Sequence, residues 1–245
     1  MKQHEAVIQT LENLGGIATL GQLNQEVFKI ENCEWKTKTP FASIRRIVQL
    51  NKEIYKIKPG LYGLISHRKQ IEARGILEET DKNKDSQEIA EFNHSYYQGL
   101  ILTIGNLKNF QTFLPYQDKN RLFINEKLAD ISTLDKIPLY SYDELVKRSA
   151  TIDVIWFNDR KMPHSFFEVE HSTDIQNSLL KFNDLQDFSA RMFVVADKIR
   201  KSEFEKKLNY AGLKDIKSRV QFLDYETLTK QYEQATESAK FSVVI

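Results

Sequence analysis

The sequence predicts an α+β domain followed by an α/β domain, and three observations predict this fold class. Residues 1–66 combine apolar residues at helical spacing with two short strand patterns. Residues 67–85 are charged and nearly free of aromatic side chains, which is typical of a linker. Within residues 86–245, helix patterns alternate with strand patterns, as expected for a central mixed sheet flanked by helices.

The first domain is expected to contain three helices and a hairpin. Apolar residues recur at helical spacing in residues 4–14, and Thr19 can cap a second helix. Thr39 and Pro40 predict the start of a third helix, because a capping hydroxyl precedes a proline at the first helical position. Residues 54–65 predict two short strands about a Pro-Gly turn. This order of elements is that of a winged helix.

The charge of the chain is uneven, although the net charge is only +1. Residues 1–68 carry a net charge of +4, so the remainder carries −3. Seven basic residues and one acidic residue, Glu53, lie between positions 36 and 58. The basic ones are Lys36, Lys38, Arg45, Arg46, Lys52, Lys56 and Lys58. A short basic block on a neutral protein suggests an anion-binding face, and an ordinary solvated surface is the alternative.

Composition excludes several classes of protein. Charged residues make up 28% of the chain and Gly and Pro are scarce, which excludes a disordered or collagen-like protein. The single cysteine, Cys33, excludes an intrachain disulfide and a cysteine-rich zinc site. The longest uncharged apolar stretch, residues 100–107, is too short to cross a membrane, and the N-terminus lacks the apolar core of a signal peptide. We therefore expect a soluble, cytoplasmic protein without membrane partners.

The second domain is expected to begin with a helix from Ser86 to about Gly105. A short strand at 110–114 and a helix at 143–148 follow. Three strong strand patterns come next, at residues 152–157, 165–170 and 192–196. Helices are predicted at 173–188, 202–209 and 226–234, with a last strand at 220–223.

Three carboxylates lie on two of these predicted strands. Asp153 is the second residue of one strand, and Glu168 and Glu170 share one face of the next because strand side chains alternate. If the two strands pair, the three carboxylates surround one point and repel each other unless a cation is bound. Oxygen ligands without cysteine favour Mg²⁺ or Mn²⁺, which can activate water and stabilise charge on a phosphate. The alternative is that each acid only caps a loop.

The order helix, strand, strand with Asp153, strand with Glu168-Val-Glu170, helix, strand resembles the core of the PD-(D/E)xK nuclease superfamily. The segments Ile-Asp-Val-Ile-Trp-Phe157 and Phe-Phe-Glu-Val-Glu-His-Ser-Thr173 are similar to restriction endonucleases of that group. Residues 1–66 resemble the winged-helix modules fused to such enzymes. The resemblance implies three parts: a winged-helix DNA-binding domain at 1–66, a charged linker at 67–85, and a restriction-endonuclease-like nuclease domain at 86–245.

The resemblance also implies roles for individual residues. Asp153 and Glu168 match metal ligands of the superfamily, and Glu170 stands where lysine is usual. A minority of restriction enzymes in the superfamily carry glutamate there and remain active. Lys181, on the following helix, could supply a migrated ammonium, although a solvated helix residue is the preferred interpretation. Glu91, on the preceding helix, is either a fourth carboxylate or a surface glutamate.

Two further kinds of site receive less support. The histidines His4, His67, His94, His164 and His171 show no spacing typical of metal ligands. His171 follows the motif directly, but strand alternation points it away from Glu168 and Glu170, which favours a structural or DNA-contacting role. No glycine-rich phosphate-binding loop is present, so an ATP-driven enzyme is not expected.

These observations predict a type II restriction endonuclease that hydrolyses double-stranded DNA with Mg²⁺, or alternatively Mn²⁺. The basic residues expected to meet DNA are Lys36, Lys38, Arg45, Arg46, Lys56 and Lys58. Only the resemblance implies a cognate DNA methyltransferase as a partner, and a homodimer is left open. Two alternatives are a DNA-binding regulator with a degenerate nuclease domain, which Glu170 keeps open, and a modification-dependent endonuclease.

Overall fold

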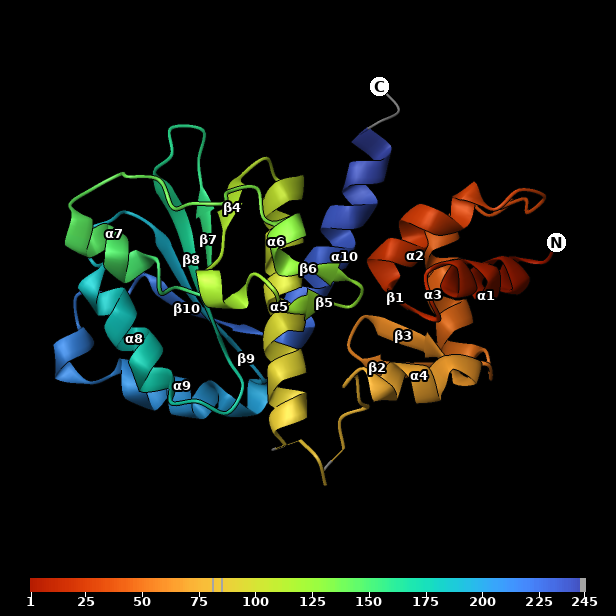
Figure 1. Cartoon of the computed structure of the whole chain (residues 1–245), viewed down its shortest axis with the longest axis horizontal. Helices are drawn as coiled ribbons and strands as arrows, with labels where there is room; N and C mark the ends of the chain where they lie inside the picture. Colours follow the sequence, from red (N-terminus) through yellow and green to blue (C-terminus); the bar gives the residue numbers. More distant parts are fainter. Residues whose placement is uncertain (81, 85, 243–245) are drawn as a thin grey trace. The chain divides into compact units, whose positions relative to one another are not determined.

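The computed structural model describes residues 1–80, 82–84 and 86–242, so positions 81 and 85 of the expected linker and positions 243–245 of the expected nuclease domain lie outside the described residues. The chain divides into two compact units (Figure 1). Unit 1 comprises Met1–Phe92 together with the described residues from Thr229 onward. Unit 2 comprises Asn93–Leu228.

Unit 1 contains short helices and a small antiparallel sheet of order β1-β3-β2. Its elements in chain order are α1 (Gln3–Asn13), β1 (Ile17–Thr19), α2 (Leu20–Glu26), a 3-10 turn (Val27–Lys29), α3 (Pro40–Leu50), β2 (Ile54–Lys58), β3 (Leu61–Leu64), a second 3-10 turn (Ile65–His67) and α4 (Arg68–Ala73). The three expected helices and the hairpin are present. Strand β1 is additional, because a three-residue strand gives too short a pattern to predict.

The local signals in unit 1 are partly confirmed. The hydroxyl of Thr19 accepts a hydrogen bond from the backbone N–H of Gln22, so Thr19 caps α2 as predicted. Pro40 begins α3, but the side chain of Thr39 forms no capping hydrogen bond, and that part of the prediction is wrong. Gly60 has a φ of +73° in the turn between β2 and β3, a conformation that glycine adopts without strain.

Unit 1 extends beyond the expected boundary at residue 66. Ile71 on α4 is 1% exposed, so the segment that was expected to be a solvated linker contributes to the packing. The last helix, α10 (Tyr225–Ser242), packs closely on α2, since a Cβ added at Gly21 would lie 2.6 Å from the ring of Tyr232. The hydroxyls of Tyr232 and Thr19 are 3.0 Å apart. Residues distant in sequence thus complete this unit, which the charge pattern could not show.

Unit 2 is built on a five-stranded mixed sheet of order β10-β9-β8-β7-β4. Strands β10, β9 and β8 are parallel, and β7 and β4 continue the sheet in antiparallel pairs. The strands are β4 (Gln111–Phe113), β7 (Val154–Phe157), β8 (Pro163–Glu170), β9 (Arg191–Ala196) and β10 (Val220–Asp224). The main helices are α5 (Gln87–Leu107), α7 (Asp143–Ser149), α8 (Ile175–Asp184) and α9 (Lys201–Leu208). The expected mixed α/β sheet flanked by helices is confirmed.

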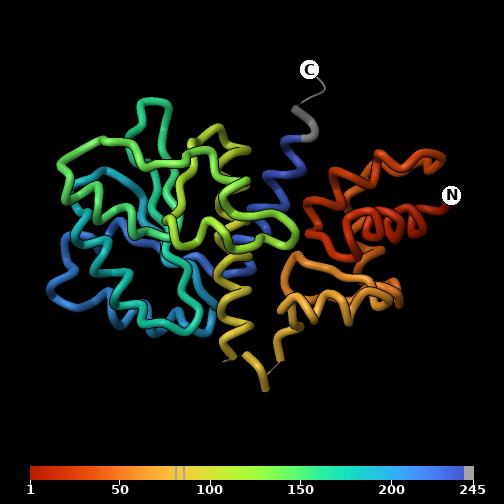
Figure 2. Tube along the Cα trace, viewed as in Figure 1, coloured from red at the N-terminus to blue at the C-terminus, as the bar shows by residue number. Residues whose placement is uncertain are grey.

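The two faces of this sheet are covered by different helices. Helices α8 and α9 lie together on one side (Figure 1), where Ile155 and Phe166 belong to the main apolar core. On the other face, the indole N–H of Trp156 donates to the carbonyl oxygen of Ile101 on α5. The irregular segment 132–142, which connects the short helix α6 (Leu128–Ile131) to α7 (Figure 2), adds Tyr140 to the core. The ends of β7 and β8 therefore lie between two helical layers.

None of the helices in the described part of the chain is both long and apolar enough to cross a membrane.

Candidate active site

The three carboxylates predicted from the sequence lie at the paired ends of β7 and β8. Val154 is in register with Phe167 in this antiparallel pair, which places Asp153, immediately before β7, next to Glu168. All three acids are buried, with exposed fractions of 8% for Asp153, 2% for Glu168 and 5% for Glu170. The hydroxyl of Ser178 donates to both glutamates, so they share a face of the sheet as predicted.

Asp153 is fixed by the backbone of the neighbouring strand. The N–H of Val169 donates to Oδ2 of Asp153 at 2.7 Å. Among the described residues no hydrogen bond reaches Oδ1, which instead faces His94. Burial raises the pKa of the Asp153 carboxyl, because a charge is poorly solvated there.

Lys181 lies against Glu168, and its expected position as a solvated helix residue is wrong. Its Nζ lies 2.7 Å from Oε2 and 3.0 Å from Oε1 of Glu168, and it also donates to the carbonyl oxygen of Thr151 at 3.0 Å. Lys181 is on the second turn of α8, the helix that follows β8 and covers this face of the sheet. Helix α8 therefore brings an ammonium to the end of β8.

Glu170 is held by hydroxyl groups. The side chains of Thr173 and Ser178 donate to its two carboxylate oxygens, and Arg200 fixes the same turn by donating to the carbonyl oxygens of His171 and Thr173. These contacts orient the carboxylate without neutralising it. Burial accordingly raises the pKa of Glu170 to about 7.

The acidic cluster of Asp153, Glu168 and Glu170 holds three carboxyl groups, and Lys181 is the cation that contacts one of them, Glu168. Burial, together with the nearby charge of Asp153, raises the pKa of Glu168 to about 8, even though Lys181 opposes this shift. Buried carboxylates of this kind either take up protons at neutral pH or are compensated by a cation. The donor set of this site therefore fits a divalent cation.

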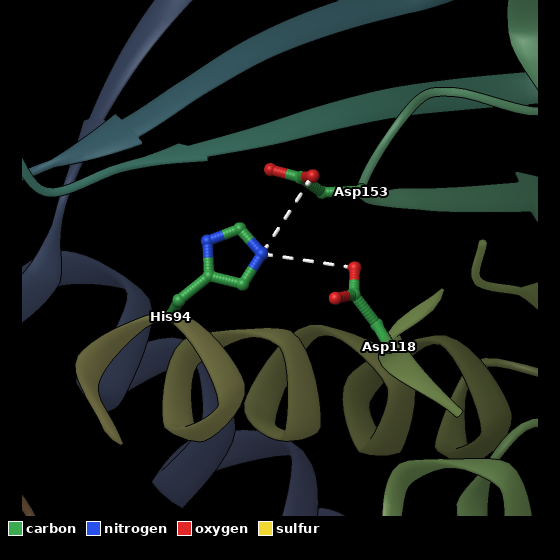
Figure 3. Close-up of side chains that lie close together, drawn as sticks. All are labelled: His94, Asp118 and Asp153. Atoms are coloured by element: carbon green, nitrogen blue, oxygen red, sulfur yellow. Dashed lines mark ion pairs between the residues drawn. The ribbon is translucent and has the colours of Figure 1, made fainter. Parts of the chain in front are cut away.

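Two residues that the sequence did not predict for the site, His94 and Asp118, face Asp153 (Figure 3). Nε2 of His94 lies 3.7 Å from Oδ1 of Asp153 and 3.8 Å from Oδ2 of Asp118. One ligand atom from each of the three residues lies within 4.8 Å of the others, so the three could share a metal ion. The expected trio of Asp153, Glu168 and Glu170 is not such a group in the described part of the chain.

The charges of Asp153 and Asp118 change the pKa of His94, and His94 in turn changes the pKa of Asp118. Burial acts to lower the pKa of His94, but the charges of Asp153 and Asp118 outweigh it and raise this pKa. Burial likewise acts to raise the pKa of Asp118, but the nearby His94, the hydrogen bond from Gln98 and the charge of Arg121 hold it below its usual value.

Of the two alternatives for Glu91, the structure fits the surface glutamate. Its side chain is exposed and accepts a hydrogen bond from Gln87. One helical turn further along α5, His94 faces the sheet instead. Asp118 comes from a 3-10 turn (Tyr116–Asp118) that follows β4. Spacing among the histidines could not reveal this group, because its three members come from three separate segments.

His171 points away from Glu168 and Glu170, as strand alternation predicts. Its Nδ1 lies 3.1 Å from the side-chain amide nitrogen of Asn93 on α5, which covers the opposite face of the sheet. This contact supports a structural role for His171.

The basic residues expected to meet DNA divide into two groups in unit 1. Four are exposed: Lys36, Lys38, Arg46 and Lys56. Arg45 instead lies 3.1 Å from Glu233 and 3.4 Å from Glu237 on α10, because α10 packs beside α3. Arg45 was expected to meet DNA, but its guanidinium, although partly exposed, is paired with two carboxylates.

Lys58 is buried, and its expected contact with a phosphate is wrong. It is 4% exposed, and its Nζ lies 4.5 Å from the centre of the Phe92 ring. Burial lowers the pKa of Lys58 to about 7, although the charge of Glu79 acts in the opposite direction.

The fold and site thus define an α/β protein with a buried, acidic, candidate metal-binding centre. A family model described as the type II restriction enzyme NmeDI C-terminal domain matches residues 76–244. The match covers more than half of the chain, and the chain belongs to this family.

One relative is the type II restriction enzyme NmeDI of Neisseria meningitidis serogroup C, which is 26% identical over 149 residues. The alignment covers 57% of this chain and 42% of that protein, so the chain spans less than half of the relative's length. No solved structure matches the chain. Residues 1–75 lie outside the family match.

Proposed function

We propose that the chain is a type II restriction endonuclease of PD-(D/E)xK type that hydrolyses phosphodiester bonds in double-stranded DNA. The observation that carries the proposal is the burial of Asp153, Glu168 and Glu170 at the joined ends of β7 and β8, with Lys181 beside them. Buried charge is unfavourable for folding unless it is compensated, and its concentration at one point indicates a function. The family relationship supports the same class of enzyme.

Asp153 and Glu168 are the residues that would hold a Mg²⁺ ion. Both present carboxylate oxygens, the donors that Mg²⁺ prefers, and both lack full compensation by protein cations. Such an ion, when bound, stabilises the negative charge that develops on the phosphate during hydrolysis. Mn²⁺ accepts the same ligands.

Lys181 and Glu170 have separate roles in the proposed mechanism. Lys181 orients Glu168 through two hydrogen bonds and brings the positive charge that the usual motif lysine supplies in this superfamily. Glu170, oriented by Thr173 and Ser178, takes a proton from the attacking water as the new oxygen–phosphorus bond forms. The bond from phosphorus to the leaving oxygen breaks, and that oxygen takes up a proton from solvent.

Unit 1 is proposed to be a winged helix that grips DNA. Its order of elements, α1, β1, α2, α3, β2 and β3, supports this assignment. The exposed side chains of Lys36, Lys38, Arg46 and Lys56 lie before α3, on α3 and on β2, and these would meet phosphates.

The test is incubation of the purified chain with unmethylated and methylated plasmid DNA, with Mg²⁺ or with EDTA. Discrete double-strand fragments from the unmethylated plasmid with Mg²⁺ alone are expected, and protection by methylation would indicate a cognate methyltransferase as the partner. Cleavage of methylated DNA alone would indicate a modification-dependent enzyme. DNA binding without cleavage under all conditions would indicate a regulator with a degenerate nuclease domain.

A further inference from the structure

We propose that His94, Asp118 and Asp153 form a second cation site in unit 2, which takes a divalent transition-metal ion such as Mn²⁺ in preference to Mg²⁺. The proposal rests on the proposed function only because Asp153 belongs to both sites. It concerns a different face of the sheet, since His94 comes from α5, whereas Glu168 faces α8, which carries Lys181.

The geometry of the group fits coordination better than hydrogen bonding. The separations of 3.7 Å and 3.8 Å between Nε2 of His94 and the two carboxylate oxygens are too long for hydrogen bonds. Two ligands at about 2.1 Å from one ion lie roughly 3.0–3.4 Å apart at the usual coordination angles. The two separations from His94 exceed this range by only a few tenths of an ångström, and all three donor atoms lie within 4.8 Å of one another.

The imidazole of His94 is oriented with a lone pair toward the two carboxylates. Its Nδ1 lies 3.2 Å from the carbonyl oxygen of Val169, and a carbonyl oxygen can only accept, so Nδ1 carries the hydrogen. In neutral His94 this leaves Nε2 as an unprotonated donor that faces Asp153 and Asp118 (Figure 3). Three electron-rich atoms that converge in this way favour a bound cation.

Outer contacts fix each of the two carboxylates. Oδ1 of Asp118 forms an ion pair with Arg121, whose Nε lies 2.9 Å away, and Oδ2 accepts a hydrogen bond from Nε2 of Gln98 at 2.9 Å. Oδ2 of Asp153 accepts from Val169, while Oδ1 receives no hydrogen bond among the described residues and faces Nε2 of His94. Partners of this kind typically orient metal ligands in proteins. The largely buried oxygen of Asp153 is thus directed at the point where an ion would lie.

The donor set favours a transition metal. Imidazole nitrogen suits the divalent ions of the first transition series, among which Mn²⁺ binds most weakly and also accepts carboxylate oxygens, whereas Mg²⁺ prefers oxygen ligands alone and retains water. One nitrogen and two carboxylate oxygens leave further positions open to solvent or substrate. Selectivity between Mn²⁺ and Mg²⁺ is therefore expected to depend on His94.

The experiment measures Mn²⁺ binding to the full chain in the absence of DNA, by the loss of the electron paramagnetic resonance signal of free Mn²⁺. The wild type is expected to retain bound Mn²⁺ in a hundredfold excess of Mg²⁺. His94→Gln and Asp118→Asn are each expected to weaken Mn²⁺ binding at least tenfold. His164→Gln is the matched control, because His164 lies at the opposite end of β8 and contacts Ser165, and it should bind Mn²⁺ as the wild type does.

A second measurement on the wild type alone does not depend on the variants folding. Electron spin echo modulation of bound Mn²⁺ should show coupling to an imidazole nitrogen. Absence of this coupling, displacement of Mn²⁺ by an equal concentration of Mg²⁺, or unchanged affinity in a folded His94→Gln variant would overturn the proposal. Glu168→Gln should retain the nitrogen-coupled ion, which separates this site from the proposed nuclease site. A chain that binds Mn²⁺ in this way but never cuts DNA would refute the proposed function and leave the metal site standing.

Discussion

Nζ of Lys181 lies 2.7 Å from Oε2 of Glu168, although the two residues belong to different elements and are 13 positions apart. Helix α8 carries the ammonium to the position beside the strand where a motif lysine is usual in the superfamily that this sequence resembles. Glu170, which replaces that lysine, lies on the same face and is held by hydroxyl groups. In the proposed mechanism, the functions of that lysine are divided between Glu170 on β8 and Lys181 on α8.

Replacement of Lys181 by Met is expected to lower both stability and cleavage. Without the Lys181 ammonium, Glu168 is buried with no cation beside it, which should reduce the free energy of unfolding by about 2 kcal/mol. This loss is smaller than for a fully buried ion pair, because the side chain of Lys181 is partly exposed. Denaturant unfolding measures the loss. The double variant Lys181→Met, Glu168→Gln should recover stability but not cleavage. Lys201→Met, on an exposed lysine of α9, is the control, and equal behaviour of both single variants would contradict the assignment.

Glu170→Gln is expected to keep the fold and DNA binding while reducing the rate of cleavage by about 10²-fold or more. The amide oxygen of Gln can accept a hydrogen bond from one of the two hydroxyls of Thr173 and Ser178, and its NH2 group can donate to the other, but Gln cannot take a proton from water. Single-turnover cleavage of a plasmid measures the rate. Glu91→Gln, on the exposed surface of α5, should cut normally. Normal cleavage by Glu170→Gln together with an inactive Lys181 variant would contradict the role proposed for Glu170 and show that Lys181 on α8 is the essential residue.

Combined replacement of Lys36, Lys38, Arg46 and Lys56 by alanine is expected to weaken DNA binding and its salt dependence. Each phosphate contact that is lost should reduce the slope of log affinity against log salt by about 0.9. Binding titrations at several salt concentrations measure this slope. Arg45→Ala is the matched control, because its guanidinium already pairs with Glu233 and Glu237 and should contribute little to the slope. An unchanged slope in the combined variant would show that unit 1 has another role.

Lys58 makes stability depend on pH in a direction that can be tested. Burial lowers its pKa to about 7 in the folded chain, against an ordinary value of 10.5 when the chain is unfolded, so the unfolded chain binds more protons between these values. The contribution of Lys58 to stability is therefore greatest above about pH 10.5, is lost as the pH falls toward 7, and changes little below that. Lys58→Met should stabilise the chain at about pH 6, with a gain that shrinks toward about pH 10. Thermal unfolding at these pH values measures the gain, and a gain independent of pH would contradict the account.

The sequence predicted the strands and helices of the sheet well because their apolar patterns are long and regular. Strand alternation correctly placed Glu168 and Glu170 on one face, since that periodicity is a property of the backbone. The sequence pattern could not predict that Arg45 would form ion pairs with residues of α10, or that Lys58 would be buried. Both features depend on contacts between segments that are distant in the sequence. His94 and Asp118 were missed for the same reason, while Glu91 was chosen one helical turn too early on the correct helix.

The most direct test of the central claim is plasmid cleavage by Asp153→Asn compared with the wild type, both with Mg²⁺. Asparagine can still accept the hydrogen bond from Val169, so the fold should be retained, as circular dichroism would show. If Asp153 is a metal ligand of the nuclease site, the wild type gives discrete double-strand fragments, and Asp153→Asn cleaves the plasmid more slowly by about 10³-fold or more. Cleavage by folded Asp153→Asn at the wild-type rate would contradict this role of Asp153.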